Sequence, residues 1–133
     1  MATLNERSER NLAGVHPLLV KIVREAAQKC SFTVTEGVRT VQRQQELYAQ
    51  GRTTAGKIVT NVDGVNAKSN HQPKEDGYGY AVDIYANPIN VDDTVNIAAI
   101  AAHIKIAALN NGVKVEWGGD WKMKDYPHFE LKV

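Results

Sequence analysis

Residues 69–85 read SNHQPKEDGYGYAVDIY, a polar, glycine-containing loop that leads into a short and mostly apolar run. That run, residues 81–85, is typical of a buried β-strand. Asp83 is the exception within it, and a carboxylate in such a strand needs a partner because an unpaired buried charge is costly. A metal ion is one such partner. The segment therefore predicts a buried strand that carries a functional carboxylate.

Two histidines flank this strand in the sequence. His71 lies in the polar loop before it, and His128 lies near the C-terminus, three residues after Asp125. Two imidazoles and one carboxylate are a common ligand set for a catalytic zinc ion, which keeps its fourth position open for water. Calcium and magnesium prefer all-oxygen sites. We therefore expect His71, Asp83 and His128 to bind Zn²⁺ and Asp125 to transfer protons. The spacing alone leaves the alternative that these four are ordinary polar residues without a metal.

Hydrophobic periodicity in the rest of the chain predicts alternating helices and strands. We expect helices at residues 5–12, 15–29 and 41–50, and a fourth that Asp92 or Asp93 caps and Asn111-Gly112 ends. We expect strands at residues 32–36, 81–85, 113–117 and 128–131, and a long loop at 52–68 with room for a small hairpin. This order predicts an α+β fold: one small domain with a mainly antiparallel sheet, flanked by about three helices, and the zinc site at the sheet.

Composition and charge exclude several functional classes. The 133 residues carry a net charge of +1 and no dense lysine and arginine run, so no nucleic-acid partner is expected. The single Cys30 rules out an internal disulfide. No apolar run approaches the ~20 residues that span a membrane, and residues 1–11 lack the apolar core of a secretory signal. We expect cytoplasmic synthesis and no stable membrane association. His16 and His103 are expected to be ordinary helix residues.

Several motifs, taken in order, resemble those of one enzyme family. Ser69-x-His71 followed by Gly79-x-Ala81-x-Asp83 resembles the two halves of the S-x-H-x-x-G-x-A-x-D signature of the zinc peptidases that include the D-alanyl-D-alanine carboxypeptidases and dipeptidases. Residues 117–121 with 125–131, and residues 37–40 with 44–53, are similar to the L-alanyl-D-glutamate peptidase branch, which includes phage endolysins and bacterial cell-wall hydrolases.

The spacing of the first motif departs from the family pattern. The family usually places the aspartate seven positions after the first histidine, whereas here Asp83 follows His71 by twelve. The surplus lies around residues 72–76, a polar stretch that can bulge outward at little entropic cost. Glu75 and Asp76 therefore remain alternative metal ligands.

The resemblance also implies roles for other residues. Asp125 would act as the general base, and Arg39, at a strand-to-helix junction, would face the oxyanion or a substrate carboxylate. Ser69, Tyr80 and Trp121 would bind substrate or support the ligands. Asp120 is expected to be a turn-former rather than a catalyst.

The implied substrate is the peptidoglycan stem peptide, cut between L-alanine and D-glutamate. We expect residues 1–133 to form a single catalytic peptidase domain, without a separate cell-wall-binding domain, that acts as a monomer. The resemblance implies an endolysin that a holin releases from the cytoplasm to the wall. The alternatives are a D-alanyl-D-alanine carboxypeptidase on the same scaffold and a zinc-stabilised binding module without catalysis.

Overall fold

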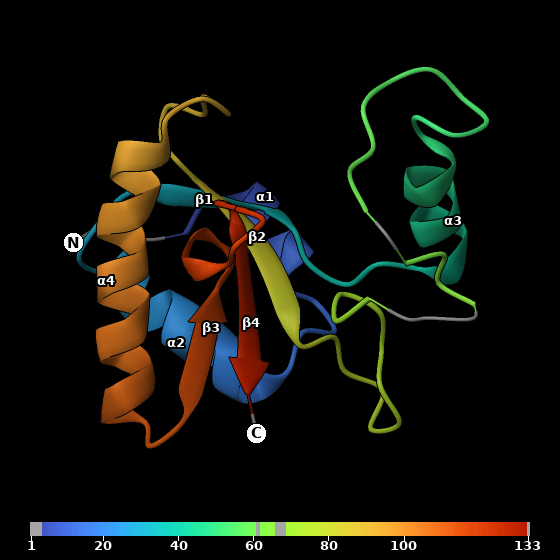
Figure 1. Ribbon diagram of the computed structural model, residues 1–133. Helices are drawn as coiled ribbons and strands as arrows, with labels where there is room; N and C mark the ends of the chain where they lie inside the picture. Colours follow the sequence, from blue (N-terminus) through green and yellow to red (C-terminus); the bar gives the residue numbers. More distant parts are fainter. Residues whose placement is uncertain (1–3, 61, 66–68, 133) are drawn as a thin grey trace.

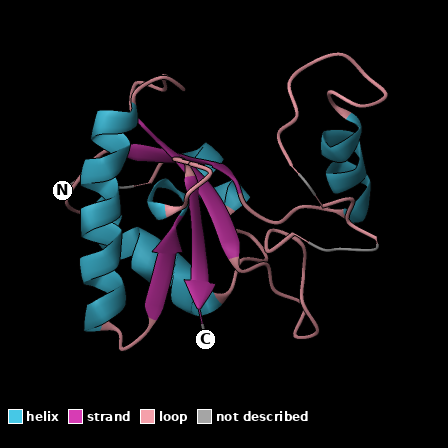
Figure 2. Cartoon of the chain, in the orientation of Figure 1, coloured by secondary structure: helices cyan, strands magenta, loops and turns pink. Residues whose placement is uncertain are grey.

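The computed structural model of the protein describes residues 4–60, 62–65 and 69–132. Within them, four strands form one antiparallel sheet in the order β1-β2-β4-β3: β1 (Phe32–Glu36), β2 (Ala81–Ala86), β3 (Lys114–Trp117) and β4 (His128–Lys132). Figures 1 and 2 show α2 (Pro17–Ala27) and α4 (Thr94–Asn110) beside this sheet, while α3 (Val41–Ala49) stands apart from it. The predicted α+β fold is confirmed. The short helix expected at residues 5–12 also forms, as α1 (Glu6–Asn11), so four helices accompany the sheet.

The helices begin at the capping residues that the sequence predicts. Thr40 Oγ1 accepts a hydrogen bond from the Arg43 N–H at the start of α3, and Asp93 Oδ1 accepts one from the Asn96 N–H at the start of α4. His16 caps α2 through its Nδ1, just before Pro17, which agrees with its interpretation as an ordinary helix residue. None of the helices in the described part of the chain is long and apolar enough to cross a membrane.

The loop that follows α3 differs from the sequence prediction in one respect. Its described residues, 52–60 and 62–65, form no hairpin, and residues 61 and 66–68 of the predicted range lie outside the described residues. The loop is instead held by a side chain of α3. Gln44 is fully buried, and its Nε2 donates to Thr60 Oγ1 and to the Val62 carbonyl oxygen. These bonds replace the cross-strand pairing that a hairpin would need.

Alternation along the strands separates an apolar face of the sheet from a polar one. The apolar face packs into the hydrophobic core with α2 and α4, and includes Val82, Ile84, Phe129 and Leu131, all 3% exposed or less. Asp83 and the residues next to it in register project from the opposite face. The sheet therefore has one side that stabilises the fold and one that is free to carry a site.

An irregularity in β1 adds a further charge to the polar face. Val34 pairs with Ile84, but Glu36 pairs with Asp83, so the register shifts between them. Regular alternation would place Glu36 on the same apolar face as Val34. The extra residue, Thr35, acts as a β-bulge and turns Glu36 to the side of Asp83.

In the described part of the chain, the outer edge of β1 has no neighbouring strand. Side chains of helix α1 instead form hydrogen bonds with the backbone groups of this edge. Ser8 Oγ accepts a hydrogen bond of 2.9 Å from the Val34 N–H, and Asn11 Nδ2 donates one of 2.8 Å to the Val34 carbonyl oxygen. Unpaired edge strands invite pairing with other chains, and burial without partners would be costly. The N-terminal helix therefore closes this edge with side chains.

The Ser8→Ala substitution tests this contact. Ser8 is fully buried, so its loss leaves the Val34 N–H without a partner and should lower the free energy of unfolding by about 1–3 kcal/mol. Urea denaturation measures the change. The control is Ser31→Ala, at an exposed serine, which should change stability by less than about 0.5 kcal/mol. Equal stabilities of the two variants would contradict the assigned role.

Candidate metal centre

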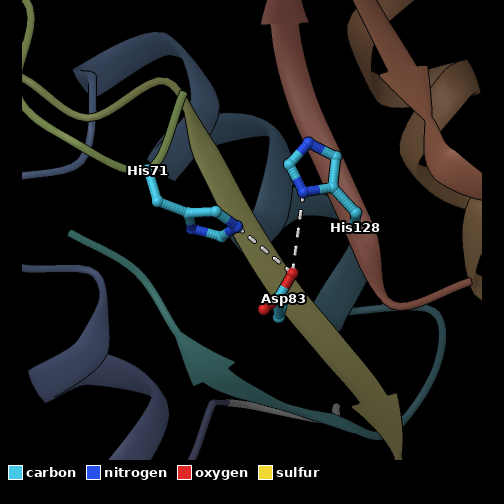
Figure 3. Close-up of side chains that lie close together, drawn as sticks. All are labelled: His71, Asp83 and His128. Atoms are coloured by element: carbon cyan, nitrogen blue, oxygen red, sulfur yellow. Dashed lines mark ion pairs between the residues drawn. The ribbon is translucent and has the colours of Figure 1, made fainter. Parts of the chain in front are cut away.

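Three side chains from distant parts of the sequence converge on the polar face of the sheet. His71 Nε2 lies 3.3 Å from Asp83 Oδ1, and His128 Nδ1 lies 3.7 Å from the same oxygen. Figure 3 shows both rings directed at this carboxylate. The three ligand atoms all lie within 4.8 Å of one another, a spacing that one metal ion can bridge. The residues predicted from the sequence therefore form a group able to hold a metal ion.

Sheet register and a loop contact bring this group together. Asp83 on β2 is the direct cross-strand partner of His128 on β4. His71 is placed from the loop before β2, where its carbonyl oxygen accepts the Arg39 N–H at 2.7 Å and its own N–H donates to Ser69 Oγ at 3.2 Å. Ser69 therefore supports the backbone of His71, which is one of the two roles predicted for it from the sequence.

The alternative ligands Glu75 and Asp76 lie outside this group. Asp76 instead accepts hydrogen bonds from the Tyr80 hydroxyl and the Tyr78 N–H. The additional residues between His71 and Asp83 thus bulge away from the metal centre.

Each histidine is oriented by a hydrogen bond from its other ring nitrogen. His71 Nδ1 lies 2.9 Å from the Gly37 carbonyl oxygen, which can only accept, so this nitrogen carries the proton and Nε2 is left for a ligand. His128 Nε2 lies 2.8 Å from Glu130 Oε1, which leaves Nδ1 facing Asp83. Such outer hydrogen bonds to a carbonyl or carboxylate are typical of metal-binding histidines. The chemistry of the donor set therefore fits a metal ion.

The ionisation of the group also suits a cation. Burial acts to raise the pKa of Asp83, but its hydrogen bonds with His128 and His71 outweigh burial and lower the pKa well below its usual range. Burial acts to lower the pKa of His128, but its hydrogen bonds with Asp83 and Glu130 raise this pKa to about 9. Asp83 is thus ionised at neutral pH, and a metal ion would displace the proton that His128 carries without it.

Asp125 stands beside this group in a loop with little freedom. Its Oδ2 lies 4.0 Å from His128 Nδ1, and its side chain is 49% exposed. Its N–H donates to the Gly118 carbonyl oxygen, and the Trp117 indole donates to the Tyr126 carbonyl oxygen. A Cβ on Gly118 would lie 2.1 Å from the Asp125 carbonyl oxygen, so the close approach requires glycine. Burial and the nearby charge of Asp83 raise the pKa of Asp125.

Arg39 is buried and reaches the same carboxylate. Its Nε donates to Glu36 Oε1 at 2.9 Å, its Nη1 donates to Gln44 Oε1 at 2.8 Å, and its Nη2 lies 3.7 Å from Asp83 Oδ2. Two of its three nitrogens are therefore held by protein partners. The third lies beside Asp83, so the guanidinium lies next to the metal-ligand group.

A cavity of about 510 Å³ contains the metal-ligand group, and its wall includes Arg39, Ser69, Trp121 and Asp125. The ring of Trp121 lies 5.0 Å from the ring of His128, and its Nε1 donates to Glu116 Oε1. Tyr80 lines two adjoining cavities instead of this one. The structure therefore places Tyr80 outside the metal cavity, and its role in binding substrate stays a prediction.

Sequence reasoning assigned no site role to Glu130 or Gln44. Glu130 binds His128 through Oε1 and Lys132 Nζ through Oε2 at 2.6 Å, while Gln44 holds Arg39. A signal for Glu130 exists, because residues two apart on a strand share a face. No comparable pattern marks Gln44, whose contacts are with distant loops.

The sequence and the fold match known proteins over most of the chain. The model of a family described as phage L-alanyl-D-glutamate peptidase matches residues 1–132. The peptidoglycan L-alanyl-D-glutamate endopeptidase CwlK of Bacillus subtilis is 35% identical over 107 residues, which are 74% of this chain and 59% of that protein. The L-alanyl-D-glutamate peptidase of Escherichia phage T5 is 30% identical over 132 residues, covering 96% of this chain and 87% of the phage protein.

A solved structure shares the fold. The crystal structure of the Serratia marcescens L-Ala D-Glu endopeptidase ChiX matches with a TM-score of 0.75 and 36% sequence identity, over 98% of this chain and 91% of the Serratia chain. The chain therefore spans nearly all of one solved relative but little more than half the length of the Bacillus protein.

The Glu130→Gln substitution tests how His128 is oriented. Replacing the carboxylate with an amide weakens the hydrogen bond to Nε2, so Zn²⁺ affinity should fall about 10- to 100-fold. Competition with a chromophoric chelator measures this affinity, and circular dichroism checks folding. Glu46→Gln, at an exposed glutamate on α3, is the control and should bind Zn²⁺ as the wild type does. Unchanged affinity in folded Glu130→Gln protein would refute the role of Glu130.

Proposed function

Because this chain belongs to the phage L-alanyl-D-glutamate peptidase family, we propose that it is a zinc-dependent endopeptidase that hydrolyses the L-alanyl-D-glutamate bond of the peptidoglycan stem peptide. The observation that carries the proposal is the convergence of His71, Asp83 and His128 beside Asp125 in one cavity. The names of the relatives support this bond over the D-alanyl-D-alanine alternative.

The three convergent side chains would hold the zinc ion. Neutral imidazoles and one carboxylate leave about one positive charge on the centre, and a bound zinc ion polarises a carbonyl and lowers the pKa of water to about 7. The protein's contribution is orientation. Gly37 and Glu130 hold the two rings, and Arg39 holds the outer oxygen of Asp83.

Asp125 would transfer the protons of the reaction. Its raised pKa makes it a better base than an ordinary surface aspartate, and its half-exposed carboxylate can reach both solvent and substrate. It would accept the proton of the attacking water and pass it to the leaving amine nitrogen. The hydrogen bonds that the carbonyl oxygens of Gly118 and Tyr126 accept would keep the Asp125 loop in place for both transfers.

Arg39 would stabilise negative charge that develops on the substrate. A buried guanidinium whose position is fixed by Glu36 and Gln44 pays little to reorganise when charge appears nearby. Nη2 is the nitrogen on the side of the metal-ligand group, and it carries two N–H groups, so that one can face Asp83 and the other would face the substrate. Trp121, against His128, would form part of the wall along the peptide.

The same proposal includes the biological setting. The substrate would be the bacterial cell wall, the enzyme would act as a monomeric endolysin, and a holin would release it. The match to a phage peptidase supports the peptidoglycan substrate, while the monomeric state and the release by a holin stay predictions.

Analysis of the reaction products tests the bond. Incubation with purified stem peptides should yield a new C-terminal L-alanine and a new N-terminal D-glutamate by mass spectrometry. A chelator should abolish cleavage, and added Zn²⁺ should restore it. Release of terminal D-alanine alone would instead establish the carboxypeptidase alternative, and no cleavage by zinc-loaded protein would establish a binding module.

Asp125→Asn tests the proton-transfer step. The amide keeps the shape of the side chain but cannot accept a proton, so kcat should fall about 10²- to 10⁴-fold while Zn²⁺ affinity changes little. The control is Asp120→Asn, because Asp120 is an exposed turn residue paired with Lys105. It should retain near wild-type kcat. Equal kcat values for Asp125→Asn and wild type would remove Asp125 from the mechanism.

A further inference from the structure

The loop between His71 and β2 builds a second cavity, which shares lining residues with the cavity at the metal centre. This cavity, of about 780 Å³, is lined by residues 72–76 and Tyr80, and it shares Ser69 and Asn70 with the metal cavity. A smaller cavity of about 290 Å³ joins Asn70 and Lys74 to Glu130. Asn70 lines all three cavities, so a ligand that extended from the metal centre toward the loop would pass this residue.

The loop has internal hydrogen bonds that hold its shape. The Lys74 N–H donates to the Tyr78 carbonyl oxygen, and the Gly77 N–H donates to the Lys74 carbonyl oxygen, each at 2.9 Å. The Tyr80 hydroxyl binds Asp76 across the turn. At the base, the Gly79 N–H donates to the Gly14 carbonyl oxygen, which ties the loop to the N-terminal segment. Lys74 therefore projects from a fixed turn.

Lys74 supplies a positive charge to both of these cavities. Its Nζ lies over the Tyr80 ring, 4.3 Å from the centroid, and it forms no ion pair with the residues that the structure describes. Lys132, which lines the smaller cavity, is different because its Nζ lies 2.6 Å from Glu130 Oε2. Glu75 and Asp76 also line the larger cavity, where Asp76 already accepts hydrogen bonds from the Tyr80 hydroxyl and the Tyr78 N–H.

Asn70 supplies an oriented amide to the two cavities that Lys74 also lines. Its Nδ2 donates to Glu130 Oε2 at 2.8 Å, which fixes the plane of the amide. An amide nitrogen has two hydrogens, and one bond to Glu130 leaves the second for a ligand. A cation and an amide N–H that line the same cavity can together bind a carboxylate.

We propose that Lys74 and Asn70 form a subsite that binds a carboxylate of the substrate peptide. This inference rests on the proposed function. A peptide cut before D-glutamate has an acidic residue on the leaving side of the scissile bond. D-glutamate has two carboxyl groups, and whichever of them forms the next peptide bond, the other is a free carboxylate. The next residue of the stem can bring a second carboxylate. Lys74 thereby sets a preference for acidic over amidated stem peptides.

Matched synthetic stem peptides test the subsite. One peptide carries all carboxylates, one carries a carboxamide on the D-glutamate, and one carries a carboxamide on the following residue. Wild-type protein should show a KM about five- to tenfold higher for one of the two amidated peptides, which identifies the carboxylate that is bound.

The Lys74→Gln variant should raise KM for the fully acidic peptide by a similar factor, with little change in kcat, and should lose the discrimination between the peptides. The Lys74→Arg variant should retain the discrimination between the peptides. The control Lys21→Gln, at an exposed lysine of α2, should behave as wild type. Discrimination that persists in Lys74→Gln, or is absent from wild type, would overturn the subsite while leaving the proposed function intact. If wild type cuts none of the peptides, the proposed function fails and the subsite fails with it.

Discussion

The carboxylate of Asp83, set in an otherwise apolar strand, is the constraint on which the rest of the site depends. A partly buried charge without partners destabilises a fold, and removing one partner of a buried pair is strongly unfavourable. The chain supplies those partners from three other segments. His71 comes from the loop before β2, His128 from β4, and Arg39 from the junction between β1 and α3. Satisfying this one charge therefore assembles the metal-ligand group.

The surrounding backbone contacts explain how the site keeps its geometry. The Gly37 carbonyl oxygen orients His71, the Gly118 carbonyl oxygen holds Asp125, and the Arg39 N–H holds the His71 carbonyl oxygen. Main-chain groups have fixed positions once the sheet has formed, so they position side chains with little entropic cost. The glycines at residues 37 and 118 are needed because a Cβ at either would lie within 2.1 Å of a carbonyl oxygen. The motifs that identify the family thus have a direct structural role.

Much of this arrangement could be predicted from the residues. Cap residues such as Thr40 and Asp93, and the two-residue alternation in β2 and β4, depend on neighbours in the sequence, so the pattern alone indicates them. The sequence context singled out His71 and His128 among the four histidines, and the family resemblance then supported this choice. The long loop predicted at residues 52–68 carries no hairpin in its described part, and the hydrogen bonds by which Gln44 holds it are long-range contacts that no local pattern reveals.

The sequence by itself determined which chemical groups are present, which face most of them occupy on regular helices and strands, and which family they resemble, because these depend on residue identity and local periodicity. The tertiary structure alone decided the strand order β1-β2-β4-β3, the bulge that turns Glu36 toward Asp83, and the placement of Tyr80 in the adjoining cavities. Register and cavity shape arise from contacts between residues far apart in the chain. Their energies are set by packing and burial in three dimensions, which the order of residues does not display.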